Sequence, residues 1–131
     1  MLQPDKHQKK LVLAIDDDPL ITELIGTVAN ERGHKFIGCG SAEKACRIVE
    51  DQRPDLIFLD LYLPLRNGIE LLEAIRRRLP NFDSPVVVLS SNNAKNTVDQ
   101  MVGLGAADYL VKPITINTLM KRMDHWVEAI S

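Results

Sequence analysis

The segment LVLAIDDD, residues 11–18, sets a pattern that recurs through the chain: an apolar run that ends in charged residues. An apolar run of this length is typical of a strand covered on both faces, as in a parallel sheet. The runs LIFLD at residues 56–60 and YLVK at residues 109–112 end in the same way. Parallel neighbours would bring these ends together in one crevice. The charged residues that would meet there are Asp16, Asp17, Asp60 and Lys112.

Apolar runs alternate five times with segments of helical spacing. This alternation predicts right-handed crossovers and an α/β fold, with one five-stranded parallel sheet and helices on both faces. The expected strands are residues 11–15, 35–38, 56–59, 86–89 and 107–111. Five helices are expected. The first begins at Pro19 after its cap Asp18, and the second begins after its cap Ser41. The other three occupy residues 68–78, 92–104 and 115–130. The fourth helix has few apolar residues and is expected to be the most mobile.

With 131 residues and 45% hydrophobic composition, the chain fits one domain whose core is large enough to be stable without disulfide bonds or a structural metal. Residues 1–10 have almost no apolar side chains and predict a flexible arm, so the domain is expected at residues 11–131. A net charge of −2 and a pI near 5.9 give no field that would draw the whole surface to nucleic acid or to anionic lipid.

The cysteines and histidines show no ligand spacing. Cys39 and Cys46 are expected to be reduced packing residues, because two cysteines at this spacing make neither a disulfide framework nor a metal site. His7, His34 and His125 are expected at the surface. No apolar run approaches the ~20 residues of a membrane helix, and the polar start is unlike a signal peptide. We therefore expect a soluble, cytoplasmic protein.

The acidic crevice predicts a metal site, since carboxylates held close together repel one another unless a cation or a proton intervenes. Mg²⁺ suits the cluster, because it takes oxygen ligands from one or two carboxylates together with a phosphoryl group. A metal and Lys112 would offset charge on a transferring phosphoryl group while one carboxylate acts as nucleophile. Asp60 is the candidate nucleophile because it stands alone at the end of its strand.

With these residues in place, the chain resembles the receiver domain of two-component response regulators from Leu11 to about Ile130. The resemblance rests on four motifs in family order and at family spacing: IDDDPL, LIFLDLYLPLRNG, PVVVLSS and DYLVKP. It implies a flavodoxin-like, doubly wound (βα)5 fold with strand order 2-1-3-4-5.

The resemblance also implies a metal site and a phosphoacceptor. Asp60 would accept the phosphoryl group. Asp17 and Asp60 would ligate Mg²⁺ directly, Asp16 would act mainly through water, and the backbone carbonyl of Tyr62 would add a ligand. Mn²⁺ could take the place of Mg²⁺.

Further roles follow from the same resemblance. Ser90 would hydrogen-bond one phosphoryl oxygen and Lys112 would pair with another, aimed by a cis peptide before Pro113. Tyr109 matches the aromatic switch position, which turns inward as the hydroxyl residue moves and so remodels the face of the fourth helix, fifth strand and fifth helix. The rate-tuning positions, which control water access, are those of Tyr62 and Asn92.

The partners implied are a histidine kinase or a histidine phosphotransfer protein, and an unknown downstream protein or output domain. The output would be binding and not catalysis on a substrate, with no direct nucleic-acid binding by this domain and no membrane contact. A phosphorylation-dependent homodimer is left open.

Other interpretations are open at this point. A degenerate receiver would dock constitutively, without phosphorylation. A phosphatase of the haloacid dehalogenase kind also uses an aspartate nucleophile and Mg²⁺, but it needs a second aspartate two residues on, where this chain has Tyr62. Apart from the family pattern, Asp16 and Asp17 could be loop residues and Tyr109 could be ordinary packing.

Overall fold

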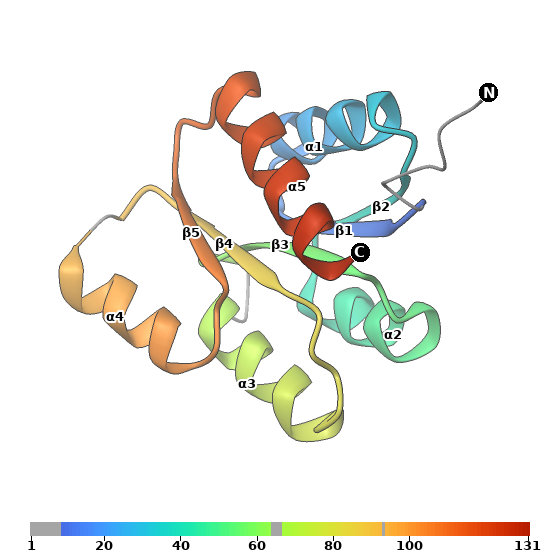
Figure 1. Ribbon diagram of the computed structural model, residues 1–131. Helices are drawn as coiled ribbons and strands as arrows, with labels where there is room; N and C mark the ends of the chain where they lie inside the picture. Colours follow the sequence, from blue (N-terminus) through green and yellow to red (C-terminus); the bar gives the residue numbers. More distant parts are fainter. Residues whose placement is uncertain (1–8, 64–66, 93) are drawn as a thin grey trace.

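The computed structural model describes residues 9–63, 67–92 and 94–131, and it contains one parallel sheet in the order β2-β1-β3-β4-β5 (Figure 1). The strands are β1 (Leu11–Ile15), β2 (Lys35–Cys39), β3 (Leu56–Asp60), β4 (Val86–Ser90) and β5 (Asp108–Val111). The helices are α1 (Pro19–Glu31), α2 (Ala42–Gln52), α3 (Gly68–Arg78), α4 (Lys95–Gly103) and α5 (Ile116–Ile130). The expected fold class and strand order are confirmed.

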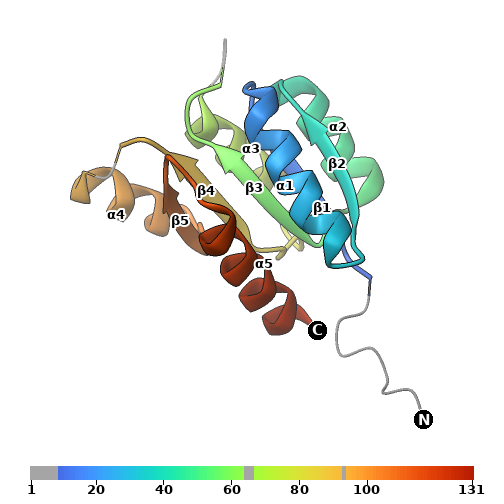
Figure 2. The same ribbon diagram turned by 90° about the horizontal axis from the view of Figure 1, so that it is seen from above.

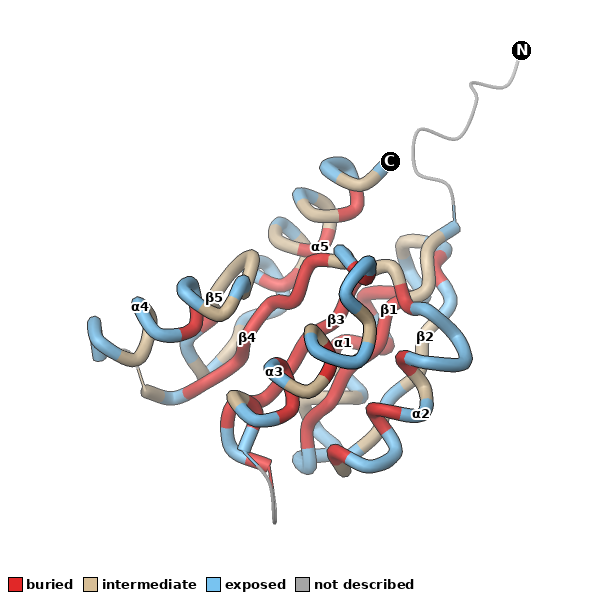
Figure 3. The backbone as a smooth tube through the Cα atoms, turned by 90° about the horizontal axis from the view of Figure 1, so that it is seen from below, coloured by how far each residue is buried: buried red, intermediate tan, exposed pale blue. Residues whose placement is uncertain are grey.

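Helices cover both faces of the sheet, with α1 and α5 on one face and α2, α3 and α4 on the other (Figures 1 and 2). Alternate strand residues enter the two cores: Leu13 and Ile57 pack toward α2 and α3, while Val12 and Phe58 pack toward α1 and α5. Every residue of β3 and β4 is buried (Figure 3). The two-sided burial explains why these strands have no polar residue before their last position.

Most of the expected elements are present within one or two residues, but the fourth helix begins at Lys95 and not at Asn92. The Asn92 side chain accepts a hydrogen bond from the Ala94 N–H, and its carbonyl accepts one from the Tyr109 hydroxyl. These contacts hold Asn92 in a turn outside the helix.

One histidine differs from expectation. His34 is 5% exposed, and its Nδ1 accepts the Lys10 N–H at 3.2 Å, so the prediction of a surface position was wrong for this residue. The His34 ring accepts the backbone N–H of Lys10 beside the starts of β1 and β2. A sequence pattern does not predict this contact. His125 is exposed, as predicted, and His7 lies outside the described residues.

The predicted arm, residues 1–10, falls mostly on residues 1–8, which lie outside the described residues. The carbonyl of Lys10 accepts the Lys35 N–H at 2.9 Å, beside the start of the sheet. Both cysteines are free, as predicted. Among the helices that the structure describes, none has the length and apolar character needed to cross a bilayer.

Helix α3 begins directly against the end of β3. The Gly68 N–H donates to the Leu61 carbonyl at 2.7 Å, and the Asn67 side chain caps the helix by accepting the Glu70 N–H at 2.8 Å. A Cβ at Gly68 would lie 2.6 Å from the Asp60 carbonyl oxygen, which is backbone and cannot rotate away. The chain therefore needs glycine here to pass so close to Asp60.

Strand β5 is tied to α5 through one carboxylate. Asp108, with a 14% exposed side chain, accepts hydrogen bonds from Arg122 and from the Trp126 indole N–H. Burial raises the pKa of the Asp108 carboxyl, but the hydrogen bonds from Arg122, Trp126 and the Tyr109 N–H outweigh it and hold this pKa below its ordinary value. The ion pair therefore contributes stability only while Asp108 is charged.

Gly68→Ala should lower the free energy of unfolding by about 1–3 kcal/mol, because the added methyl group overpacks rigid backbone. Urea unfolding would measure the change. Gly103→Ala is the matched control, since a Cβ at Gly103 meets nothing within 4 Å. Equal effects of the two substitutions would contradict this explanation.

Asp108→Asn should lower the free energy of unfolding at about pH 7 by about 1 kcal/mol, since the charged hydrogen bonds are weakened. The folded-state pKa is depressed, so the contribution is present above the unfolded pKa of about 3.9 and is lost as pH falls through the folded-state value. Urea unfolding of both proteins at several pH values should show the difference shrinking below that range. A difference that persists at low pH would argue against the ion pair, and Asp51→Asn on the exposed end of α2 serves as control.

Candidate functional site

Four charged side chains meet at the carboxyl ends of three strands. Asp16 and Asp17 follow β1, Asp60 ends β3, and Lys112 follows β5. One carboxylate oxygen from each of the three aspartates lies within 4.8 Å of the other two. Lys112 Nζ lies 2.9 Å from Asp16 Oδ2 and 3.7 Å from Asp60 Oδ1. The structure thus brings together the residues that the strand pattern predicted to converge.

Asp16 carries the least satisfied carboxylate of this group. The residue is 2% exposed, and its Oδ1 accepts the Asp18 N–H at 2.9 Å. Its Oδ2 lies in ion-pair contact with Lys112 Nζ at 2.9 Å and has no further hydrogen-bond partner among the described residues. A buried carboxylate oxygen that has one ammonium group as its only partner is costly to keep charged, and a divalent cation would offset that cost.

Asp60 is 4% exposed, and its Oδ1 accepts the Tyr62 N–H at 3.2 Å. Burial raises the pKa of the Asp60 carboxyl to about 6; the Tyr62 N–H and Lys112 oppose the rise, and the charge of Asp16 adds to it. Without a cation, the cluster therefore retains a proton more readily than ordinary carboxylates do.

Lys112 lies between Asp16 and Asp60 with 23% of its side chain exposed. Burial lowers the pKa of its ammonium group, but the contact with Asp16 and the charge of Asp60 outweigh burial and raise this pKa above its ordinary value. The Lys112–Pro113 peptide is cis, as the family resemblance implied. Lys112 is thus a fixed positive charge beside Asp60.

The donor set fits a hard divalent cation. Three carboxylates face one ammonium group, so the cluster has an excess of negative charge. Mg²⁺ binds oxygen ligands and keeps several waters, which suits a site where Asp17 is exposed. Asp16, Asp17 and Asp60 are the side chains that could hold it.

Ser90 ends β4, between the strands that carry Asp60 and Lys112. It is 1% exposed, whereas Ser91 is exposed, so the buried hydroxyl is that of Ser90. The Ser90 Oγ accepts the Asn92 N–H at 3.0 Å. Ser90 thus lies at the end of its strand, as the sequence predicted, and its role stays a prediction.

Tyr109 is half-buried beside a small apolar cluster formed by Leu61, Val88 and Met101. Its hydroxyl donates to the carbonyl of Asn92. The ring therefore connects β5 to the loop after Ser90. Its role as a switch stays a prediction.

Tyr62 and Asn92 meet above the site, which sequence reasoning missed. Asn92 Nδ2 donates to the Tyr62 hydroxyl at 3.3 Å and to Thr97 Oγ1 at 3.3 Å. The two residues were predicted as separate positions that control water access. No sequence signal could have joined them, because they are 30 residues apart on different loops.

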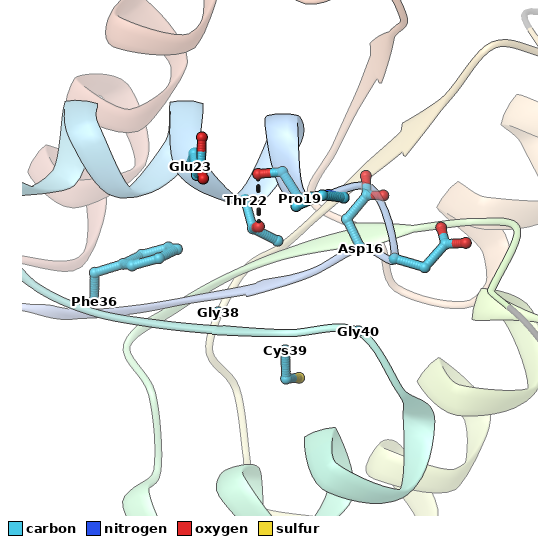
Figure 4. Close-up of a pocket in the computed structure, with 9 residues that line it drawn as sticks. Asp16, Pro19, Thr22, Glu23, Phe36, Gly38, Cys39 and Gly40 are labelled. Carbon is cyan, nitrogen blue, oxygen red and sulfur yellow. Dashed lines mark hydrogen bonds between the residues drawn. The ribbon is translucent and has the colours of Figure 1, made fainter.

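An open cavity of about 420 Å³ lies beside the acidic cluster, between the start of α1 and the end of β2 (Figure 4). Figure 4 shows Phe36 toward one end and Asp16 toward the other, with the Thr22 hydroxyl donating to the Pro19 carbonyl between them. Glycines at positions 38 and 40 leave this side without bulky side chains. The cluster is therefore approachable from the α1 side.

Comparisons with known proteins agree with this geometry. The response regulator receiver domain model matches residues 12–124. The phosphate regulon transcriptional regulatory protein PhoB of Pseudomonas aeruginosa is 31% identical over 114 residues, which cover 87% of this chain and 50% of that protein. The DNA-binding response regulator MtrA of Mycolicibacterium smegmatis is 34% identical over 117 residues, which cover 88% of this chain and 49% of that protein. The chain thus spans about half the length of the curated relatives it matches.

A solved structure gives the same result. The Francisella response regulator 1452 receiver domain superposes with a TM-score of 0.85 at 28% identity, covering 94% of this chain and 100% of that one. The family model spans nearly the whole strand and helix array, including the acidic cluster and Lys112. The chain therefore belongs to the family of response regulator receiver domains of two-component systems.

Proposed function

We propose that this receiver domain accepts a phosphoryl group on Asp60 from a phosphohistidine of a histidine kinase or of a histidine phosphotransfer protein. The observation that carries the proposal is the position of Asp60, buried at the end of β3 with two further carboxylates within 4.8 Å and Lys112 Nζ 3.7 Å away. A buried carboxylate at a strand end, with a nearby ammonium group and two further carboxylates that could hold a metal, is suited to act as a nucleophile toward phosphorus.

In the proposed step, an Asp60 carboxylate oxygen forms a bond to phosphorus while the phosphorus–nitrogen bond breaks. The electron pair of that bond goes to the imidazole nitrogen of the donor, and the product is an acyl phosphate. Mg²⁺ held by the aspartates, or Mn²⁺ in its place, would offset negative charge at the phosphoryl oxygens. Attack of water on the acyl phosphate restores Asp60 and releases phosphate.

The neighbouring side chains have distinct proposed roles. Lys112 pairs with a phosphoryl oxygen, and the Ser90 hydroxyl donates to another. Asp17 and Asp60 would hold the metal directly, Asp16 would act mainly through water, and the backbone carbonyl of Tyr62 would supply a further ligand. Tyr62 and Asn92, which meet above the site, control the access of water and so set the lifetime of the phosphoryl group.

The proposed output is a changed binding surface. Tyr109 follows the movement of Ser90 and remodels the face of α4, β5 and α5, each of which exposes an apolar residue. These residues are Val102, Val111 and Ile116. The partner on this face is a downstream protein, an output domain or a second copy of the chain, and the domain itself binds no nucleic acid or membrane.

The proposed role is that of a cytoplasmic phosphoacceptor that assists its own phosphorylation and dephosphorylation, and not that of an enzyme acting on a separate substrate. Tyr62, and not an acid, stands two residues after Asp60, which disfavours the phosphatase alternative. A constitutive docking module would need no metal site, and the cluster of three carboxylates around a single ammonium group disfavours that alternative.

Asp60→Asn should abolish phosphoryl acceptance, because the amide is a poor nucleophile, while the sheet is retained. The measurement is intact mass after incubation with acetyl phosphate, with Mg²⁺ and with EDTA. Wild type and the control Asp83→Asn, an exposed loop residue, should gain one phosphoryl group only with Mg²⁺. Full labelling of the Asp60→Asn variant would show that the acceptor is another residue.

Asp17→Asn should weaken Mg²⁺ binding by about tenfold or more, since it removes one charged ligand from the cluster. Calorimetric titration with magnesium chloride measures the affinity. Asp18→Asn is the matched control: it changes the adjacent acid, and asparagine is an equally good helix cap. A larger loss of affinity in the control than in Asp17→Asn would refute the ligand assignment.

A further inference from the structure

Helix α4 begins without a side-chain cap of its own. The other four helices of the described chain begin with a residue whose side chain accepts a backbone N–H of the first turn: Asp18, Ser41, Asn67 and Thr115. The corresponding residue of α4 is Ala94, which makes no such bond. The helix also buries a single residue, Met101, so its attachment to the domain is slight. Within the helix, the Asn96 side chain accepts the Thr97 N–H at 3.0 Å. The residues before and at the start of the first turn take their further side-chain contacts from outside the helix.

Asn92 supplies these contacts. Its Oδ1 accepts the Ala94 N–H at 2.9 Å, and its Nδ2 donates to Thr97 Oγ1 at 3.3 Å, within the first turn of α4. An asparagine that bonds the backbone two residues on fixes the chain in a turn and does locally what a cap does. The start of α4 is thus held from a residue outside the helix.

The same residue is bonded to the acidic site. Asn92 Nδ2 also donates to the Tyr62 hydroxyl at 3.3 Å, and the Tyr62 N–H donates to Asp60 Oδ1 at 3.2 Å. The Asn92 N–H donates to Ser90 Oγ at 3.0 Å, and the Asn92 carbonyl accepts from the Tyr109 hydroxyl. One residue therefore joins the loop after Asp60, the end of β4, the ring on β5 and the start of α4.

We propose that Asn92 is the positioning residue that links the occupancy of the Asp60 site to the order of helix α4. The proposal rests on the proposed function, because it takes a phosphoryl group at Asp60 as the input. A shift of Ser90 toward that group changes the acceptor of the Asn92 N–H, and a shift of Tyr62 withdraws the acceptor of Nδ2. Either change alters the contacts that hold Ala94 and Thr97.

The first test is amide hydrogen exchange of the unphosphorylated protein, followed by mass spectrometry. Asn92→Ala should speed exchange in the first turn of α4 by about fivefold, the effect of losing one cap. Tyr62→Phe, which removes only the hydroxyl, should speed it by a smaller factor. Exchange in α1 and α2 is the internal control. No change at α4 in either variant would overturn the proposal.

A second experiment tests whether Asn92 transmits a change at Asp60 to α4 or only caps this helix. Ala94→Ser gives α4 a cap of its own at a residue that is exposed and already extended, with φ −61° and ψ 135°. In Asn92→Ala/Ala94→Ser, exchange of α4 in the free protein should return toward that of wild type. The change in α4 exchange on adding Mg²⁺ and beryllofluoride, which bind at Asp60, should stay smaller in the double variant than in wild type. A double variant that responds as fully as wild type would reduce Asn92 to a cap and overturn the proposal.

The two proposals can fail separately. If wild type gains no phosphoryl group from acetyl phosphate and shows no response of α4 to beryllofluoride, the proposed function and the link that depends on it both fail. If wild type is phosphorylated and α4 does not depend on Asn92 or Tyr62, only the link fails.

Discussion

The burial of parallel strands on both faces is the constraint on which the rest of this structure depends. Strands β3 and β4 are buried at every position, and the functional side chains stand at or just after the last residues of the strands. Packing on two sides fixes the strand ends in register, so Asp60 and Ser90 are held by rigid backbone. The apolar cores therefore hold the charged groups close together despite their mutual repulsion.

In the acidic site, negative charges outnumber the positive charges that could pair with them. Lys112 offsets part of the charge of three carboxylates, yet one buried oxygen of Asp16 has no further hydrogen-bond partner among the described residues. The raised pKa of Asp60 has the same origin, since burial and a like charge both disfavour its ionised form. A site of this kind responds strongly to a bound cation or an added phosphoryl group, which is the property a receiver needs.

The strand and helix order, the convergence of the four charged residues and the caps Asp18 and Ser41 could all be predicted from the sequence. These features follow from local rules: apolar runs, helical spacing and capping residues are written in neighbouring positions. The start of the fourth helix and the burial of His34 could not be predicted in this way. The burial of His34 involves a hydrogen bond with Lys10, and the turn at Asn92 combines local bonds with one from the distant Tyr109.

By itself, the sequence determined the fold class and the chemistry of the site, because periodicity and residue type decide which segments are buried and which groups end the strands. The tertiary structure alone decided how the loops above the site are connected. Asn92 meets Tyr62 and Tyr109 only because the loops after β3 and β4 and the strand β5 pack side by side. Side-chain hydrogen bonds of this sort have no sequence period, since they depend on the direction of each loop and on the distance between strand ends.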